Sequence, residues 1–201
     1  MVKHSAQKQR GKTHRTTKQI ILIGTEGANK TERLYFQNFN RTQKTFSIQF
    51  ATGNATNPVG IVADTKKCRD KMDFQCGDRA YAVFDADLWG TQANQIQQAK
   101  NDAKKENIEV ILSNPCFEVW FVLHFDASTA PYNSSADVIT KLKKYIPDYE
   151  KSKDIFGDLQ CSKQTALFNA GNLRSYHQGN RTTKQSNWNP MTDVDQLVTL
   201  L

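Results

Sequence analysis

The chain has 201 residues, of which 38% are hydrophobic and 23% are charged, and its formal net charge is +7. The mean hydropathy is −0.66, and no apolar run approaches the roughly twenty residues of a membrane helix, so we expect no membrane span. No signal peptide is recognisable, and the four cysteines show neither a CxxC motif nor a histidine spacing typical of zinc sites. These features predict a soluble cytoplasmic protein with reduced thiols.

The positive charge is concentrated in residues 1–18, which contain six lysine or arginine residues and no acid. The remainder has 21 basic and 20 acidic residues, so it is almost neutral. We expect residues 1–18 to be a disordered basic tail, residues 19–125 an α/β core, and residues 126–201 a helical addition packed on that core in one compact domain. The tail either contacts nucleic-acid phosphates non-specifically or is a solvated arm.

The first predicted strand covers residues 20–23, which are apolar and mostly β-branched, and a helical pattern follows it. Glu26 therefore comes just after the carboxyl end of a buried strand, where open α/β sheets bind ligands. The turn GTEGANKT differs from a phosphate-binding P-loop because Asn29 stands where the second glycine belongs. A carboxylate inside such a cradle repels polyphosphate. The turn is thus a degenerate P-loop, the position of a catalytic acid, or an ordinary strand–helix junction.

Strands and helices then alternate with short connections. The sequence predicts strands at residues 46–51, 80–84 and 108–112, a helix that starts at Asn57-Pro58, and a helix over residues 91–107. This order is typical of a mostly parallel sheet covered by helices on both faces.

The third predicted strand ends in Asp85-Ala86-Asp87. Residues two apart in an extended chain point to the same side, so the two carboxylates are expected to lie together near the edge of the sheet. Two such carboxylates repel each other unless a cation lies between or beside them, and Mg²⁺ prefers oxygen ligands. The pattern is short and also occurs by chance.

The stretch SNPCFEVWFVLHF predicts a buried helix that starts at Asn114-Pro115 and is apolar on nearly all sides. Glu118 and His124 are unusual in such a helix. Glu118 lies one turn into the helix, where it either joins the acids at the sheet edge or stabilises its own helix start. His124 is either a catalyst or a structural histidine.

The remaining residues predict helices at 135–145, at 164–176 and from 192 onward. Between them, residues 172–189 are polar and contain Arg174 and Arg181. We interpret this segment as a loop that faces substrate.

The acids at one sheet edge resemble those of the Toprim domain, in which a glutamate acts as general acid/base and a DxD motif holds Mg²⁺. Four motifs, EGANKTERLYF, VFDADLW, SNPCFEVWFVLHF and NPMTDVDQLV, resemble in that order those of the RloB family of AbiLii-like abortive-infection proteins. The resemblance implies a Toprim-like, Rossmann-like core with a C-terminal helical addition, a role in phage defence, and a companion ATPase encoded nearby. The residues that fall on the first three motifs are Glu26, Gly27, Thr31 and Glu32, then Asp85 and Asp87, then Asn114, Glu118 and His124.

The leading hypothesis is a nuclease that uses Mg²⁺ or Mn²⁺ to hydrolyse phosphodiesters in DNA or RNA. The alternatives are a non-catalytic nucleic-acid-binding or sensor subunit of a defence complex and a degenerate P-loop enzyme. Oligomerisation with further copies of the chain is left open. The candidate site residues are Glu26, Lys30, Glu118 and His124 as catalytic groups, Glu26, Glu32, Asp85 and Asp87 as metal ligands, and Lys30, Asn114, Arg174 and Arg181 as substrate contacts.

Overall fold

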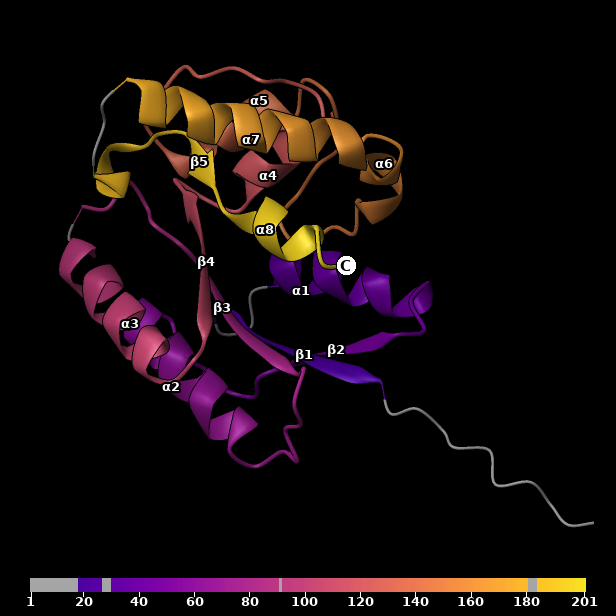
Figure 1. Ribbon diagram of the computed structural model, residues 1–201. Helices are drawn as coiled ribbons and strands as arrows, with labels where there is room; N and C mark the ends of the chain where they lie inside the picture. The colour runs from indigo at the N-terminus through magenta and orange to yellow at the C-terminus, as the bar shows by residue number, and fades with distance from the viewer. Residues whose placement is uncertain (1–17, 27–29, 91, 181–183) are drawn as a thin grey trace, which may run out of the picture.

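The computed structural model describes residues 18–26, 30–90, 92–180 and 184–201, which form a five-stranded sheet with helices on both faces (Figure 1). The strands lie in the order β2-β1-β3-β4-β5. Their bounds are β1 (Gln19–Gly24), β2 (Phe46–Phe50), β3 (Arg79–Asp85), β4 (Glu109–Asn114) and β5 (Met191–Thr192). The helical elements are α1 (Lys30–Gln37), η1 (Asn38–Arg41), α2 (Pro58–Arg69), α3 (Ala93–Lys105), α4 (Glu118–Val122), α5 (Ser135–Leu142), α6 (Phe156–Gln160), α7 (Lys163–Gly179), η2 (Gln185–Asn187) and α8 (Val194–Val198). Nearly all of the predicted basic tail lies outside the described residues.

The predicted α/β fold with a mostly parallel sheet is confirmed. Strands β1 to β4 pair in parallel, and β5 is antiparallel to β4. Gly24 at the end of β1 is opposite Ala82 in β3, and Asp85 at the end of β3 is opposite Ser113 in β4. The carboxyl ends of β1, β3 and β4 therefore meet at one edge of the sheet.

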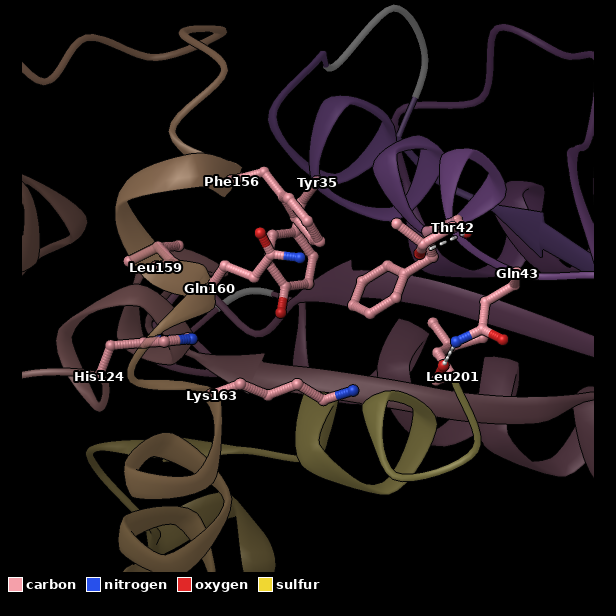
Figure 2. Close-up of a pocket in the computed structure, with 10 residues that line it drawn as sticks. Tyr35, Thr42, Gln43, His124, Phe156, Leu159, Gln160, Lys163 and Leu201 are labelled. Atoms are coloured by element: carbon pink, nitrogen blue, oxygen red, sulfur yellow. Dashed lines mark hydrogen bonds between the residues drawn. The ribbon is translucent and has the colours of Figure 1, made fainter.

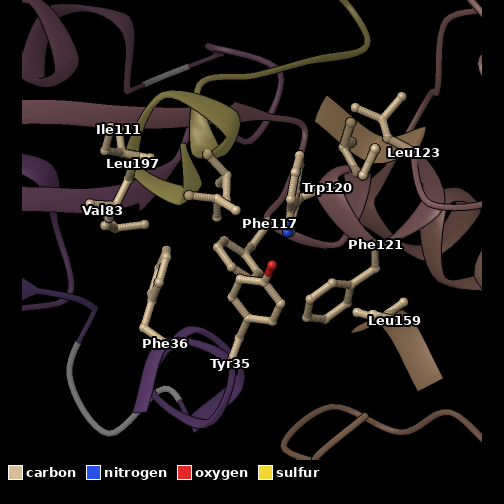
Figure 3. Packing of buried hydrophobic residues seen from close by; sticks show 14 of the residues in the cluster. Tyr35, Phe36, Val83, Ile111, Phe117, Trp120, Phe121, Leu123, Leu159 and Leu197 are labelled. Carbon is tan, nitrogen blue, oxygen red and sulfur yellow. The ribbon is translucent and has the colours of Figure 1, made fainter. Parts of the chain in front are cut away.

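Alternate strand residues bury their side chains on opposite faces of the sheet. On one face, Leu22 and Phe84 pack with α2 and α3 in one hydrophobic cluster. On the other face, Ile23 and Val83 belong to a larger cluster with α1, α4, α8 and the helices between them. Figure 3 shows aromatic residues of α1 and α4 meeting side chains of β3, β4 and α8 in this second cluster. The C-terminal helices thus share a continuous core with the sheet.

Local signals placed several elements correctly. Asn57 caps α2, because its side-chain oxygen accepts a hydrogen bond from the backbone nitrogen of Gly60 at 2.9 Å. Helix α3 lies within the helix predicted over residues 91–107, and it buries Ile96, Ala99 and Ala103.

Three expectations in the C-terminal half are wrong in their boundaries. Asn114-Pro115 does not start a helix, because Asn114 is the last residue of β4 and α4 begins only at Glu118. Helix α7 continues to Gly179, so the first part of the predicted loop at residues 172–189 is helical. The helix predicted from residue 192 onward begins only at Val194, because Thr192 belongs to the unpredicted strand β5, whose two residues pair with Ser113 and Asn114.

Gly24 is needed where β1 passes close to α2. A Cβ atom at this position would lie 1.9 Å from Oγ1 of Thr65. The glycine that resembles the start of a P-loop therefore has a packing role. The rest of that turn, residues 27–29, lies outside the described residues.

Candidate functional site

The candidate site is a group of carboxylates at the carboxyl edge of the sheet. Glu26 follows β1 by two residues, Asp85 is the last residue of β3, and Glu118 is the first residue of α4, just after β4. Glu32 lies in the first turn of α1. The parallel pairing of the strands is what brings segments from four parts of the chain to this edge.

These carboxylates are close enough to perturb one another. Burial raises the pKa of Glu26, and the charge of Asp87 raises it further. Burial also raises the pKa of Glu32, with additional contributions from Glu118 and Glu26. The pKa of Asp85 is raised well above its usual value by burial and then by Glu32, Glu118 and Asp87. The structure thus brings together all five predicted acids.

The group extends from the interior to the surface. Glu32 and Glu118 are buried, with exposed fractions of 1% and 2%. Glu26 and Asp85 are half-buried, and Asp87 is exposed. Keeping several partly or fully buried carboxylates ionised so close together costs free energy unless a cation compensates their charge.

Lys151 is a positive group facing this cluster, and sequence reasoning missed it. Its Nζ lies 4.0 Å from Oε1 of Glu118, and its side chain is 52% exposed. Its charge lowers the pKa of Glu26, Glu32 and Asp85, opposing the effect of burial. Lys151 lies in a lysine-rich connection between α5 and α6, where nothing in the sequence distinguishes it from its neighbours.

Tyr149, in the same connection, fixes the position of Glu118. The Tyr149 hydroxyl donates a hydrogen bond to Oε1 of Glu118 at 3.0 Å, and both side chains are buried. The backbone nitrogen of Ser152 donates to Oγ1 of Thr31 at 3.2 Å. These two contacts attach the connection to α4 and α1 respectively, so that Lys151 lies over the acids.

The loop after β3 has an unusual backbone. Asp87, Leu88 and Trp89 have φ angles of 44°, 61° and 62°, in the left-handed region that non-glycine residues rarely adopt. The expectation of an extended Asp-Ala-Asp segment is therefore wrong at Asp87, although its charge still raises the pKa of Asp85. The strained conformation is maintained by hydrogen bonds that backbone nitrogens of this loop donate to acceptors at the end of β4 and at Pro115.

Asn114 supplies one of those hydrogen bonds. Its Oδ1 accepts from the backbone nitrogen of Leu88 at 3.0 Å, and its Nδ2 donates to the backbone oxygen of Trp188 at 2.7 Å. The backbone nitrogen of Asp87 also donates to the oxygen of Pro115 at 3.1 Å. Asn114 was predicted to contact substrate, and the structure places its buried amide between two backbone segments, where it positions the aspartate loop.

The other predicted residues lie elsewhere or outside the described part of the chain. His124 is buried, donates from Nδ1 to the backbone oxygen of Trp120 at 2.9 Å, and lines a separate cavity. Arg174 forms an ion pair with Asp195 at 2.7 Å. Neither His124 nor Arg174 is among the groups that perturb the carboxylates. Arg181 and the side chain of Lys30 are outside the described residues.

The donor set has the chemistry of a site for a hard divalent cation, since it consists of carboxylate oxygens in a cluster with excess negative charge. Within residues 18–26, 30–90, 92–180 and 184–201, however, no group of three or more Asp, Glu, His or Cys side chains is arranged to hold a metal ion.

Comparison with known proteins identifies one family. The model of the family described as RloB-like protein matches residues 21–201. No curated protein and no solved structure matches the chain. None of the helices described here combines the length and apolarity required to cross a membrane. Because the match extends over nearly the whole sequence, the chain belongs to the RloB-like protein family.

Proposed function

We propose that the chain is a metal-dependent nuclease of the Toprim type that hydrolyses phosphodiesters of DNA or RNA in phage defence. The observation that supports this proposal is the convergence of Glu26, Asp85 and Asp87 at the carboxyl edge of a parallel sheet. The setting in defence and the companion ATPase as partner are what the resemblance to the RloB family implies.

Electrostatics supports a requirement for a divalent cation. The described site contains five carboxylates and one facing lysine, so without further cations it repels a phosphodiester. Asp85 and Asp87 are the proposed ligands of Mg²⁺ or Mn²⁺, with Glu26 or Glu32 completing the set. When bound, the ion supplies charge neutralisation of the phosphate and activation of water.

The chain's own residues have distinct proposed roles. Glu26 is half-buried with a raised pKa, which suits a group that accepts a proton from the attacking water. The water oxygen bonds to phosphorus, the phosphorus–oxygen bond to the leaving group breaks, and the leaving oxygen receives a proton from solvent. Lys151 contacts the non-bridging phosphate oxygens, together with Lys30. Glu118 positions Lys151 through their ion pair.

The proposal is tested by incubating the purified protein with single- and double-stranded DNA and RNA in Mg²⁺, Mn²⁺ or EDTA, with and without the neighbouring ATPase. We expect cleavage with the divalent ions, none with EDTA, and none from Asp85→Asn. Glu109→Gln is the matched control, because Glu109 is an exposed carboxylate at the opposite end of β4. Absence of cleavage of every substrate by the wild type together with the ATPase contradicts the proposal.

A second candidate function is a non-catalytic nucleic-acid-binding or sensor subunit. The spacing of the carboxylates favours this function, because no three Asp, Glu, His or Cys side chains among the described residues are arranged to hold a metal ion. A plaque assay with the double variant Asp85→Asn/Asp87→Asn separates the two functions. Loss of defence with retained nucleic-acid binding supports the nuclease, and unchanged defence supports the sensor.

A further inference from the structure

A second candidate site lies against α1 and η1. It is a cavity of about 130 Å³ formed by α1, η1, the end of α4, and the junction of α6 and α7 (Figure 2). None of the five clustered acids lines it. A cavity of roughly 150 Å³ holds one benzene molecule, so this slightly smaller cavity is close to the size of a single six-membered ring.

Aromatic side chains form the apolar walls of the cavity. The ring of Phe156 lies 5.0 Å from that of Phe39 and 5.6 Å from that of Tyr35, measured between centroids. Leu159, which is almost fully buried, adds an aliphatic surface. Walls of this kind favour a flat ligand that presents its faces and edges to the surrounding rings.

Lys163 gives the cavity a positive charge. Its Nζ lies 5.1 Å from the centroid of the Phe39 ring, and burial lowers the pKa of its ammonium group. Among the side chains that the structure describes, no carboxylate lies within ion-pair distance of Lys163. Helix α7 begins at this residue, so the positive end of its dipole lies at the same place. An ammonium group in these surroundings favours an anionic partner.

His124 adds a hydrogen-bond acceptor. Its Nδ1–H donates to the backbone oxygen of Trp120, which leaves Nε2 unprotonated with a lone pair. Figure 2 shows a ring nitrogen of His124, the hydroxyl of Tyr35 and the ammonium group of Lys163 directed toward the same space. The cavity thus presents a cation, an acceptor and a hydroxyl around an aromatic interior.

We infer that this cavity binds a monocyclic aromatic carboxylate that carries a hydrogen-bond donor on its ring. The carboxylate pairs with Lys163, the ring packs against the aromatic wall that Phe39 and Phe156 form together, and the ring donor reaches Nε2 of His124. This inference does not depend on the proposed nuclease activity, because it uses neither the clustered carboxylates nor a metal ion.

The test is isothermal titration calorimetry of the full chain with 4-hydroxybenzoate as the probe. We expect saturable binding of one molecule per chain. The neutral analogue 4-hydroxybenzyl alcohol lacks the carboxylate, and we expect it to bind at least about tenfold more weakly than 4-hydroxybenzoate. We expect the same decrease in affinity when 4-hydroxybenzoate is titrated into Lys163→Met. Lys143→Met, which changes an exposed lysine outside the cavity, is the matched control and keeps wild-type affinity.

Benzoate distinguishes the role of His124, because it lacks the ring donor. We expect His124→Phe to weaken binding of 4-hydroxybenzoate and to leave binding of benzoate unchanged. Absence of saturable binding by the wild type overturns the inference. Equal affinity of the wild type and Lys163→Met for 4-hydroxybenzoate also overturns the inference. The melting temperature of each variant establishes that it is folded.

Discussion

Replacing Tyr149 by phenylalanine tests how the structure holds Glu118 in place. The substitution removes only the hydroxyl that donates to Oε1 of Glu118 at 3.0 Å. The phenyl ring remains, so the packing of this fully buried side chain is retained. The nearest described cation, Lys151, is 4.0 Å from the same oxygen, which is beyond hydrogen-bond distance.

The expected loss follows from the burial of both partners. A hydrogen bond to a charged acceptor contributes about 1.5–3 kcal/mol to stability. When the donor is removed and the acceptor stays buried, most of this contribution is lost, because the unpaired acceptor has no contact with water. We therefore expect Tyr149→Phe to lower the free energy of unfolding by about 2–3 kcal/mol. In a chain of this size, each 1 kcal/mol lowers the melting temperature by about 2–4 °C, so the total decrease is about 4–12 °C.

Urea denaturation and calorimetry measure this loss, with Tyr145→Phe as the matched control. The Tyr145 hydroxyl donates to Oδ2 of Asp126 at 3.1 Å, but Tyr145 is 38% exposed, so we expect a change within about 0.5 kcal/mol. In a Glu118→Gln background the cost of Tyr149→Phe should fall to about 1 kcal/mol, the value for a neutral hydrogen bond. Equal stabilities of Tyr149→Phe and Tyr145→Phe would show that the buried hydrogen bond to Glu118 contributes no more than the exposed one to Asp126.

Three further predictions concern other parts of the site and the second cavity. Asn114→Ala removes the two hydrogen bonds that the buried amide forms with the backbone at Leu88 and Trp188. We therefore expect the free energy of unfolding, measured by urea denaturation, to fall by about 2–3 kcal/mol. A decrease below about 0.5 kcal/mol contradicts the role assigned to this amide. Burial lowers the pKa of His124 to about 4 from its ordinary 6.5, so the unfolded chain takes up a proton that the native chain does not, and stability falls as the pH decreases from 6.5 toward 4. The His124→Phe variant should lose about 3 kcal/mol less over that range, and parallel stability curves for the two proteins exclude this assignment. Lys151→Gln removes the charge that lowers the pKa of Glu26, so an NMR titration should show a higher pKa for this glutamate. The control Lys153→Gln, which changes a lysine paired with Asp148, should leave the pKa of Glu26 unchanged. Identical effects of the two variants count against a specific role of Lys151.

The strands of the sheet could be predicted because they are buried on both faces. Apolar, β-branched runs at residues 20–23 and 80–84 correspond to β1 and β3 within one or two residues. Strand β5 has only two residues and no periodicity, and it exists because the chain returns to pair with β4. The apolar stretch around Trp120 is buried as predicted. Asn114 stays in the sheet because it pairs with Met191 of β5, so the helix that follows, α4, is shorter than the sequence predicts.

The acidic part of the site could be predicted for a related reason. Asp85 ends a parallel strand, and Glu26 and Glu118 each come shortly after one, so the strand order brings them to one edge. Tyr149 and Lys151 could not be predicted, because they lie in a connection with many lysines and are selected only by tertiary packing. The left-handed backbone at Asp87 depends on hydrogen bonds that the loop donates to Asn114 and Pro115, so the local sequence does not predict it.

The proposed nuclease requires that carboxylates from separate strands bind a divalent cation at one edge of the sheet. Electron paramagnetic resonance of Mn²⁺ titrated into the purified protein measures this binding without requiring a substrate. We predict saturable binding by the wild type and by Glu109→Gln, and loss of binding in Asp85→Asn. Absence of saturable binding by the wild type, or unchanged binding by Asp85→Asn, would contradict the proposed nuclease function.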